Sequence, residues 1–284
     1  MQSTSSNPLS KHFRQPKIFL TLPSKGAFYD DAALTMPETQ QLSVLAMTAK
    51  DELTIKTPDA LLNGQSTVSV IQSCLPDIHN AWNCPSIDMD AILIAIRIAT
   101  YGENMDLKVT VPGINEERTY AFNLLGALDN LVEQEFSNLL QYGEFSFEIA
   151  PLTYKQFTSI AMRTFEERRV FAVINDDDMS EEEKIEKFNE SFERLTDINI
   201  QSLLSSVKSI TIDGETVSNQ EHIAEFFDNA EKELYKAVLD HIEEQRKKFT
   251  VQPLDVELPD DDVERGAPRT LQIPITFDQS DFFA

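Results

Sequence analysis

Three side chains of types that bind transition metals recur at equal spacing in the first half of the chain. They are Cys74, His79 and Cys84, each five residues from the next. Structural zinc sites usually combine four ligands in closely spaced pairs, and no CxxC pair occurs in this sequence. We therefore predict that the chain has no metal site and that its two cysteines are ordinary half-buried thiols. Cys74, His79 and Cys84 are the candidate ligands for the alternative, a metal site.

Oxygen-bearing side chains alternate later in the chain, at Asp176, Asp178, Ser180 and Glu182. This alternation is similar to that of a calcium-binding loop. Such a loop also needs a glycine at its sixth position and a glutamate at its twelfth, and this segment has neither. The pattern instead indicates an acidic segment that leads into a helix.

The sequence contains no recognisable catalytic signature. It lacks a glycine-rich phosphate loop, a nucleophile elbow, a paired-histidine zinc motif and a dinucleotide fingerprint. The 48 acidic residues offer too many carboxylate pairs for one acid/base pair to be selected. We predict a protein with no enzymatic activity, no catalytic residues and no cofactor. A hydrolase with an unfamiliar metal-dependent acidic site remains the alternative from another functional class.

The overall charge narrows the choice of partners. Acidic residues outnumber basic ones 48 to 24, which gives a net charge of −24. Such a surface repels the phosphates of nucleic acids and of anionic membranes. The sequence shows no signal peptide and no long apolar run, and its two cysteines fit a reducing compartment. These features predict a soluble intracellular protein whose partners are other proteins.

The first half alternates between short strands and helices. Apolar alternation predicts a strand at 18–22, followed by a turn and a returning strand at 27–29. A small helix is predicted at 57–64, and a helix over 86–101, capped by Ser86, is apolar on nearly every side. The remaining predicted elements are a hairpin that turns at 112–115, a helix over 124–141 and a strand over 145–149.

The second half is mainly helical. Capping boxes at Thr153 and Ser180 predict helix starts, and the second precedes an amphipathic stripe of Ile185, Phe188, Phe192 and Leu195. The Asp213–Gly214 pair predicts a hairpin. The longest helix is expected to follow from Ser218, with a stripe that extends from residue 223 to residue 242, and a strand over 271–277 closes the chain.

We therefore predict an α+β fold in four parts. Residues 1–12 form a flexible arm, 13–150 an α+β domain with short hairpins, 151–252 a mainly helical domain, and 253–284 an acidic linker with a C-terminal docking strand. The candidate interaction residues are Phe277, Phe282 and Phe283 near the C-terminus, together with Arg97 in the apolar helix. Apolar residues at a chain end favour docking on a neighbour, and Arg97 is expected to form a buried ion pair.

Five segments of the sequence carry a resemblance when they are taken together. They are LTLPSKGAFY at 20–29, MTAKDE at 47–52, TPDALLNG at 57–64, the motif DxxLxAxRIATYG that begins at Asp90 and contains Arg97, and PITFDQSDFF at 274–283. Together they resemble the baseplate-hub assembly family of contractile-tailed, T-even-type bacteriophages. Their order and spacing cover nearly the whole chain. No segment is diagnostic alone, so the combination carries the resemblance.

The resemblance implies a late structural or assembly protein of the baseplate hub, made in the host cytoplasm and then incorporated into the virion. Its partners would be other baseplate and hub proteins, and homo-oligomerisation stays open. A transient assembly chaperone that is absent from the mature particle is the main alternative. Family members often carry cysteine pairs on hairpins, but the turn at 112–116 has none, so no zinc role is carried over.

Overall fold

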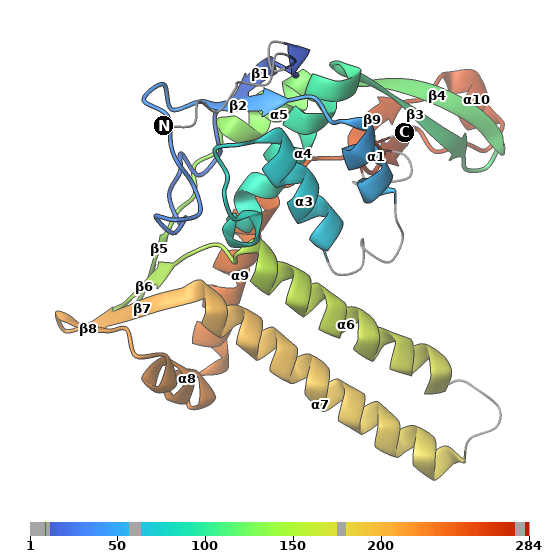
Figure 1. Ribbon diagram of the computed structural model, residues 1–284. Coiled ribbons are helices and arrows are strands. Elements are labelled where there is room, and N and C mark those ends of the chain that lie inside the picture. The colour runs from blue at the N-terminus through green and yellow to red at the C-terminus, as the bar shows by residue number, and fades with distance from the viewer. Residues whose placement is uncertain (1–8, 10–11, 57–63, 175–179, 276–281, 284) are drawn as a thin grey trace, which may run out of the picture.

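The computed structural model describes residues 9, 12–56, 64–174, 180–275 and 282–283, without the side chains of 170–174 and 181. It combines helices with small antiparallel sheets, which confirms the predicted α+β class (Figure 1). The helix predicted at 57–64 lies outside the described residues except for Gly64. Within the described part of the chain, no helix combines the length and apolarity that crossing a membrane requires.

The first of two hydrophobic clusters is built around α4, Ser86–Tyr101. Most side chains of α4 are buried, including the isoleucines of its middle, which agrees with the all-round apolar sequence. The other elements that contribute buried residues to this cluster include β1 (Pro16–Leu20), β2 (Leu42–Leu45), α1 (Ala49–Ile55), α3 (Gln65–Cys74), η2 (Ala81–Asn83) and α5 (Leu124–Val132). The prediction that the Ser86 side chain caps α4 is wrong, because Pro85 takes the N-cap position and no side chain caps the helix.

The segment after β1 forms turns that carry polar groups into the first cluster. The backbone N–H of Ser24 donates to Asp88 at 2.8 Å, the Ser24 hydroxyl donates at 2.6 Å, and the Tyr29 hydroxyl donates at 3.0 Å. The strand predicted at 27–29 is therefore absent from this segment. β1 pairs instead with β2, and Leu20 stands opposite Leu42.

Two carboxyl groups of α4 are predicted to make stability depend on pH. Burial raises the pKa of both Asp88 and Asp90 to about 6, although hydrogen bonds from Ser24 and from Val251 act in the opposite direction. Because both pKa values lie above those of the unfolded chain, the folded state binds protons more readily between about pH 4 and 6. The contribution to stability is present at low pH and is lost as the pH rises through about 6.

This pH effect can be isolated with Asp88→Asn, which removes one titrating group. We expect wild type to gain about 1.3 kcal/mol relative to this variant when the pH falls from 7 to 5. Urea unfolding at both pH values measures the difference. An unchanged difference would show that Asp88 does not titrate in this range.

The segment after residue 250 returns to the first cluster. Its elements are β9 (Leu254–Glu257), α10 (Asp260–Glu264) and β10 (Thr270–Ile273), and β9 and β10 pair antiparallel. Arg118 donates to both carboxylate oxygens of Asp262, at 2.6 and 2.8 Å, and thereby ties this segment to the β3–β4 hairpin. That hairpin, Asn104–Val111 with Glu116–Asn123, turns where it was predicted.

The second cluster packs two helices on a four-stranded sheet of order β5-β6-β7-β8. Its elements are β5 (Leu139–Tyr142), β6 (Phe145–Ile149), β7 (Val207–Ile212), β8 (Glu215–Val217), α8 (Gln220–Asp228) and α9 (Lys232–Lys248). Two helix predictions are wrong here. The helix from Leu124 ends at Val132 before β5 begins, and the single helix expected after Ser218 is divided between α8 and α9.

Helices α6 (Tyr154–Ile174) and α7 (Glu181–Ser206) form a long hairpin that projects from the body of the molecule (Figure 1). Both predicted capping boxes are present, from Thr153 to Gln156 and from Ser180 to Glu183. Arg194 of α7 forms an ion pair with Glu167 of α6 at 2.8 Å, which joins the helices midway along the hairpin. Because the hairpin projects from the body of the molecule (Figure 1), much of its surface is exposed to solvent.

Candidate interaction surface on the α6–α7 hairpin

Large apolar side chains are exposed along one face of the hairpin. We call this set the hairpin strip: Phe157 and Phe165 of α6, which are 40 and 53 % exposed, and Ile185, Phe188 and Phe192 of α7, which are 60, 48 and 60 % exposed. The α7 members recur at three and four residues, so they lie on one side of the helix. Exposed apolar groups in such a contiguous set are characteristic of protein interaction sites.

The α7 side of the strip lies beside the buried seam of the hairpin. Ser191 and Ile198, also separated by helical spacing, are 0 and 2 % exposed. The rings of Phe188 and Phe192 are stacked, with centroids 6.5 Å apart and planes 11° from parallel. The helix therefore buries one line of side chains and presents an adjacent, preformed aromatic line to solvent.

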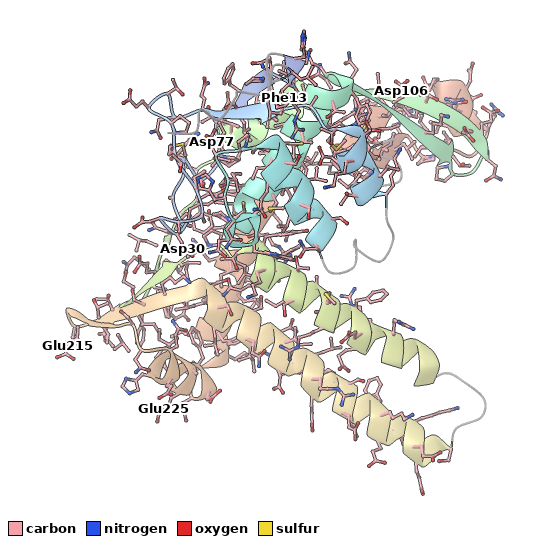
Figure 2. All side chains as sticks on the ribbon, viewed as in Figure 1. Phe13, Asp30, Asp77, Asp106, Glu215 and Glu225 are labelled. Carbon is pink, nitrogen blue, oxygen red and sulfur yellow. The ribbon has the colours of Figure 1, made fainter. Side chains whose placement is uncertain are left out.

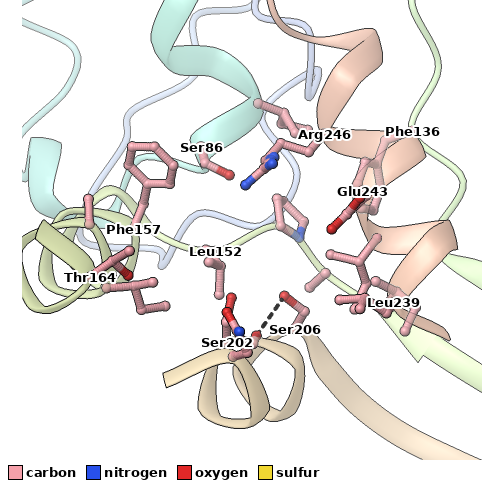
Figure 3. A pocket seen from close by; sticks show the side chains of 18 of the residues that line it. Ser86, Phe136, Leu152, Phe157, Thr164, Ser202, Ser206, Leu239, Glu243 and Arg246 are labelled. Atoms are coloured by element: carbon pink, nitrogen blue, oxygen red, sulfur yellow. Dashed lines mark hydrogen bonds between the residues drawn. The ribbon is translucent and has the colours of Figure 1, made fainter. Parts of the chain in front are cut away.

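At its base the strip opens into a groove of about 770 Å³ between the hairpin and α9. Figure 3 shows Phe157 and Thr164 of α6, Ser202 and Ser206 of α7, and Leu239, Glu243 and Arg246 of α9 around this space. Phe157 and Phe165 belong both to the groove and to the strip. Thr196 also lines the groove and lies one helical turn from Phe192, so the two surfaces are continuous.

The groove is mainly apolar, with a few charges at its margin. Arg168 and Arg246 line it together with Glu243. Neither arginine belongs to a salt bridge in the part of the chain that the structure describes. The apolar walls can therefore bury apolar side chains of another chain, and the two arginines at the edge can pair with its carboxylates.

The predicted metal candidates occupy three different environments. The Arg14 guanidinium approaches the Cys74 thiol, the His79 ring bonds Thr35 at 2.8 Å, and Cys84 lies close to Tyr29 and Asp88. Burial raises the pKa of Cys74 to about 11 and that of Cys84 to about 12, which disfavours the thiolate that binds a metal. No group of three metal-binding side chains comes together within the described ranges.

The C-terminal aromatic residues pack into this chain's own first cluster. Phe282 and Phe283 are 0 and 1 % exposed, and their rings are in edge-to-face contact at 4.9 Å. The Tyr101 hydroxyl donates to the carbonyl of Phe283 at 3.2 Å. In this conformation neither ring is available to a neighbouring protein. Phe277, the third predicted contact, lies outside the described residues.

Arg97 lies buried beside these rings, and within the described ranges it lacks the ion pair expected for it. Its guanidinium carbon is 5.1 Å from the centre of the Tyr101 ring and 5.7 Å from that of Phe282. Its Nε and Nη1 atoms are buried and have no hydrogen-bond partner among the residues that the structure describes. Burial lowers the pKa of the guanidinium, and cation–π attraction compensates only part of the lost hydration.

This arrangement predicts that Arg97→Met will not lower the melting temperature. The substitution removes two unsatisfied donors, worth about 1–3 kcal/mol each, and loses two cation–π contacts of about 1–2 kcal/mol each. Arg118→Met is the matched control and should lower the melting temperature, because Arg118 forms the ion pair with Asp262. A clear loss of stability in Arg97→Met would mean that Arg97 has a stabilising partner.

The sequence pointed only to the α7 members of the hairpin strip. The spacing of Ile185, Phe188 and Phe192 revealed an amphipathic helix, but spacing does not show whether a stripe meets its own core. Phe157 and Phe165 were not identified from the sequence at all. Their interval of eight residues, two turns of a helix that follows a capping box, is the signal that could have found them.

Comparison with known proteins gives one match. A family model described as T4 bacteriophage base plate protein matches residues 15–265 of the chain. No curated protein and no solved structure shows significant similarity. The match includes all of α6, α7 and α9, and therefore the whole interaction surface.

Proposed function

Because the chain belongs to the T4 bacteriophage base plate protein family, we propose that it is a non-enzymatic hub component that binds a neighbouring protein through the hairpin strip. Membership of the family supports a structural or assembly role in the tail baseplate of the virion, with other baseplate proteins as partners. The hub location and the use of the strip are the specific parts of the proposal.

The single observation that carries this proposal is the exposure of the hairpin strip. Five large apolar side chains on a projecting hairpin expose between 40 and 60 % of their surface. Burying one such side chain contributes about 1.5–3 kcal/mol, so covering the strip would stabilise an assembly substantially. The net charge of −24 keeps the free protein soluble until that contact forms.

The proposal is tested by counting the protein in purified mature particles and in hub intermediates from the same infection, using quantitative mass spectrometry. A small fixed copy number in both preparations is the expected result for a permanent hub component. Presence in intermediates alone would instead identify a transient assembly chaperone. Absence from both preparations would overturn the proposed location.

A further inference from the structure

We infer that the hairpin strip binds a single α-helix of another protein, and that this helix is acidic on its side facing α6 and basic on its side facing α7. The inference rests on the proposed function and specifies the partner segment. It follows from the shape of the surface, from the charges along its two edges and from the geometry of the alternative, a second copy of this chain.

The shape of the surface suits a helix. Two adjacent helices with one exposed apolar face are completed by a third helix laid along their groove. The strip supplies apolar residues from both α6 and α7, and the groove extends it to α9. Tyr235, Leu239 and Ile242 of α9 line the base of the groove, so a docked helix would end against α9.

The outer edge of the strip on α6 is basic. Arg168 lines the groove, and the Arg169 guanidinium lies 5.9 Å from the centre of the Phe165 ring. The helical repeat places Arg169 on the side of α6 opposite Glu167, which pairs with α7. Arg169 therefore borders the strip along the edge away from α7. Arg168 lies between Phe157 and Phe165 around the helix, so it places a second cation on the α6 side of the strip.

The outer edge of the strip on α7 is acidic. The helical repeat places Glu182, Glu186 and Glu193 beside the apolar line, on the side away from the buried Ser191 and Ile198. All three glutamates are exposed. A docked helix therefore meets cations along one flank and carboxylates along the other, the arrangement that selects partners in helical bundles.

A second copy of this chain fits the surface poorly. In a symmetric dimer whose hairpins point in opposite directions, α6 faces α6 of the partner, so the two basic edges oppose each other. In a dimer whose hairpins point the same way, the opposite charges do meet. The α9 walls of both grooves then occupy the same end of the interface and hold the hairpins apart.

The test uses three synthetic helical peptides with one shared apolar face. The first has a glutamate flank and a lysine flank, the second has two glutamate flanks, and the third has two lysine flanks. Binding to the purified full chain is measured by calorimetry at physiological ionic strength. Wild type should bind the mixed peptide about tenfold more tightly than either other peptide, as a few flank pairs of about 0.5 kcal/mol each predict.

Charge reversal should change the preferred peptide. Arg168→Glu with Arg169→Glu should favour the two-lysine peptide, and Glu186→Lys with Glu193→Lys should favour the two-glutamate peptide. Glu215→Lys with Glu225→Lys is the control for net charge, because these exposed residues lie on β8 and α8, away from the strip (Figure 2). This control should keep the wild-type preference.

Three results would overturn the inference. The first is the absence of peptide binding, and the second is a wild-type preference for the two-lysine peptide, which would indicate attraction by net charge alone. The third is sedimentation of the free chain as a dimer that substitutions in the strip dissociate. If the peptides fail but strip variants are still excluded from particles, the proposed function stands without this inference. If the peptides bind as expected but strip variants incorporate normally, the proposed function fails instead.

Discussion

Phe188→Glu combined with Phe192→Glu should prevent incorporation into baseplates while leaving the fold intact. Both rings are about half exposed on α7, so the stability of the free protein should change by no more than about 0.5 kcal/mol. In the assembled baseplate the partner would cover the same positions. Burying an unpaired carboxylate in that interface costs several kcal/mol. Two such charges should reduce incorporation at least a hundredfold, measured by complementation and by copy number in particles.

The chain offers a closely matched control for this double substitution. Phe13 and Phe19 are 58 and 64 % exposed. Phe19 lies in β1, at the end of the molecule away from the hairpin (Figure 1), and Phe13, which is labelled in Figure 2, lies just before that strand. Phe13→Glu with Phe19→Glu changes the same residue types and the same net charge. Normal incorporation of the control with loss of the strip variant locates the contact on the hairpin. Equal incorporation of both variants would contradict the account.

Asp88→Ala should destabilise the protein by about 3 kcal/mol. Asp88 is 0 % exposed and accepts from the Ser24 backbone, the Ser24 hydroxyl and the Tyr29 hydroxyl. Alanine leaves three buried donors without an acceptor and frees the turn that follows β1. Urea unfolding at pH 7 measures the loss.

The size of this effect depends on the hydrogen bonds rather than on the charge. Asp88→Asn should be less harmful than Asp88→Ala, because its amide oxygen still accepts from Ser24 and both hydroxyls can rotate to accept from its amino group. Asp106→Ala, on the exposed side of β3, should change stability by no more than about 0.5 kcal/mol. If Asp88→Ala is as mild as Asp106→Ala, the network does not hold the turn.

Local signals in the sequence predicted local structure well. The capping boxes at Thr153 and Ser180 and the turn at Asp213–Gly214 are formed by residues within a few positions of each other. They need no information from distant parts of the chain. Positive φ angles at Asp213 and Gly214 are those that the hairpin turn requires.

Failures occurred where distant residues decide the outcome. The segment at 24–29 could have formed a strand, but its hydrogen bonds to Asp88, about sixty residues away, make it a turn instead. The chain between Phe227 and Leu234 bends so that both α8 and α9 reach the second cluster. An uninterrupted apolar stripe does not reveal such a bend.

The same limit applies to the interaction residues. An apolar C-terminus indicates burial, but its composition does not say whose core will bury it, and Phe282 and Phe283 lie in this chain's own core. The α7 stripe has the spacing of a core-facing helix. It is exposed because the hairpin projects beyond both clusters, a property of the three-dimensional arrangement alone (Figure 1).

Photo-crosslinking from position 192 during infection tests the central claim most directly. A photoreactive phenylalanine analogue at Phe192 should crosslink to one other baseplate protein in hub intermediates, whereas the same analogue at Phe19 should not crosslink to that protein. Mass spectrometry of the adduct would also identify the partner segment, which should be a helix. A variant that is incorporated at normal levels but gives no crosslink from position 192 would contradict the account.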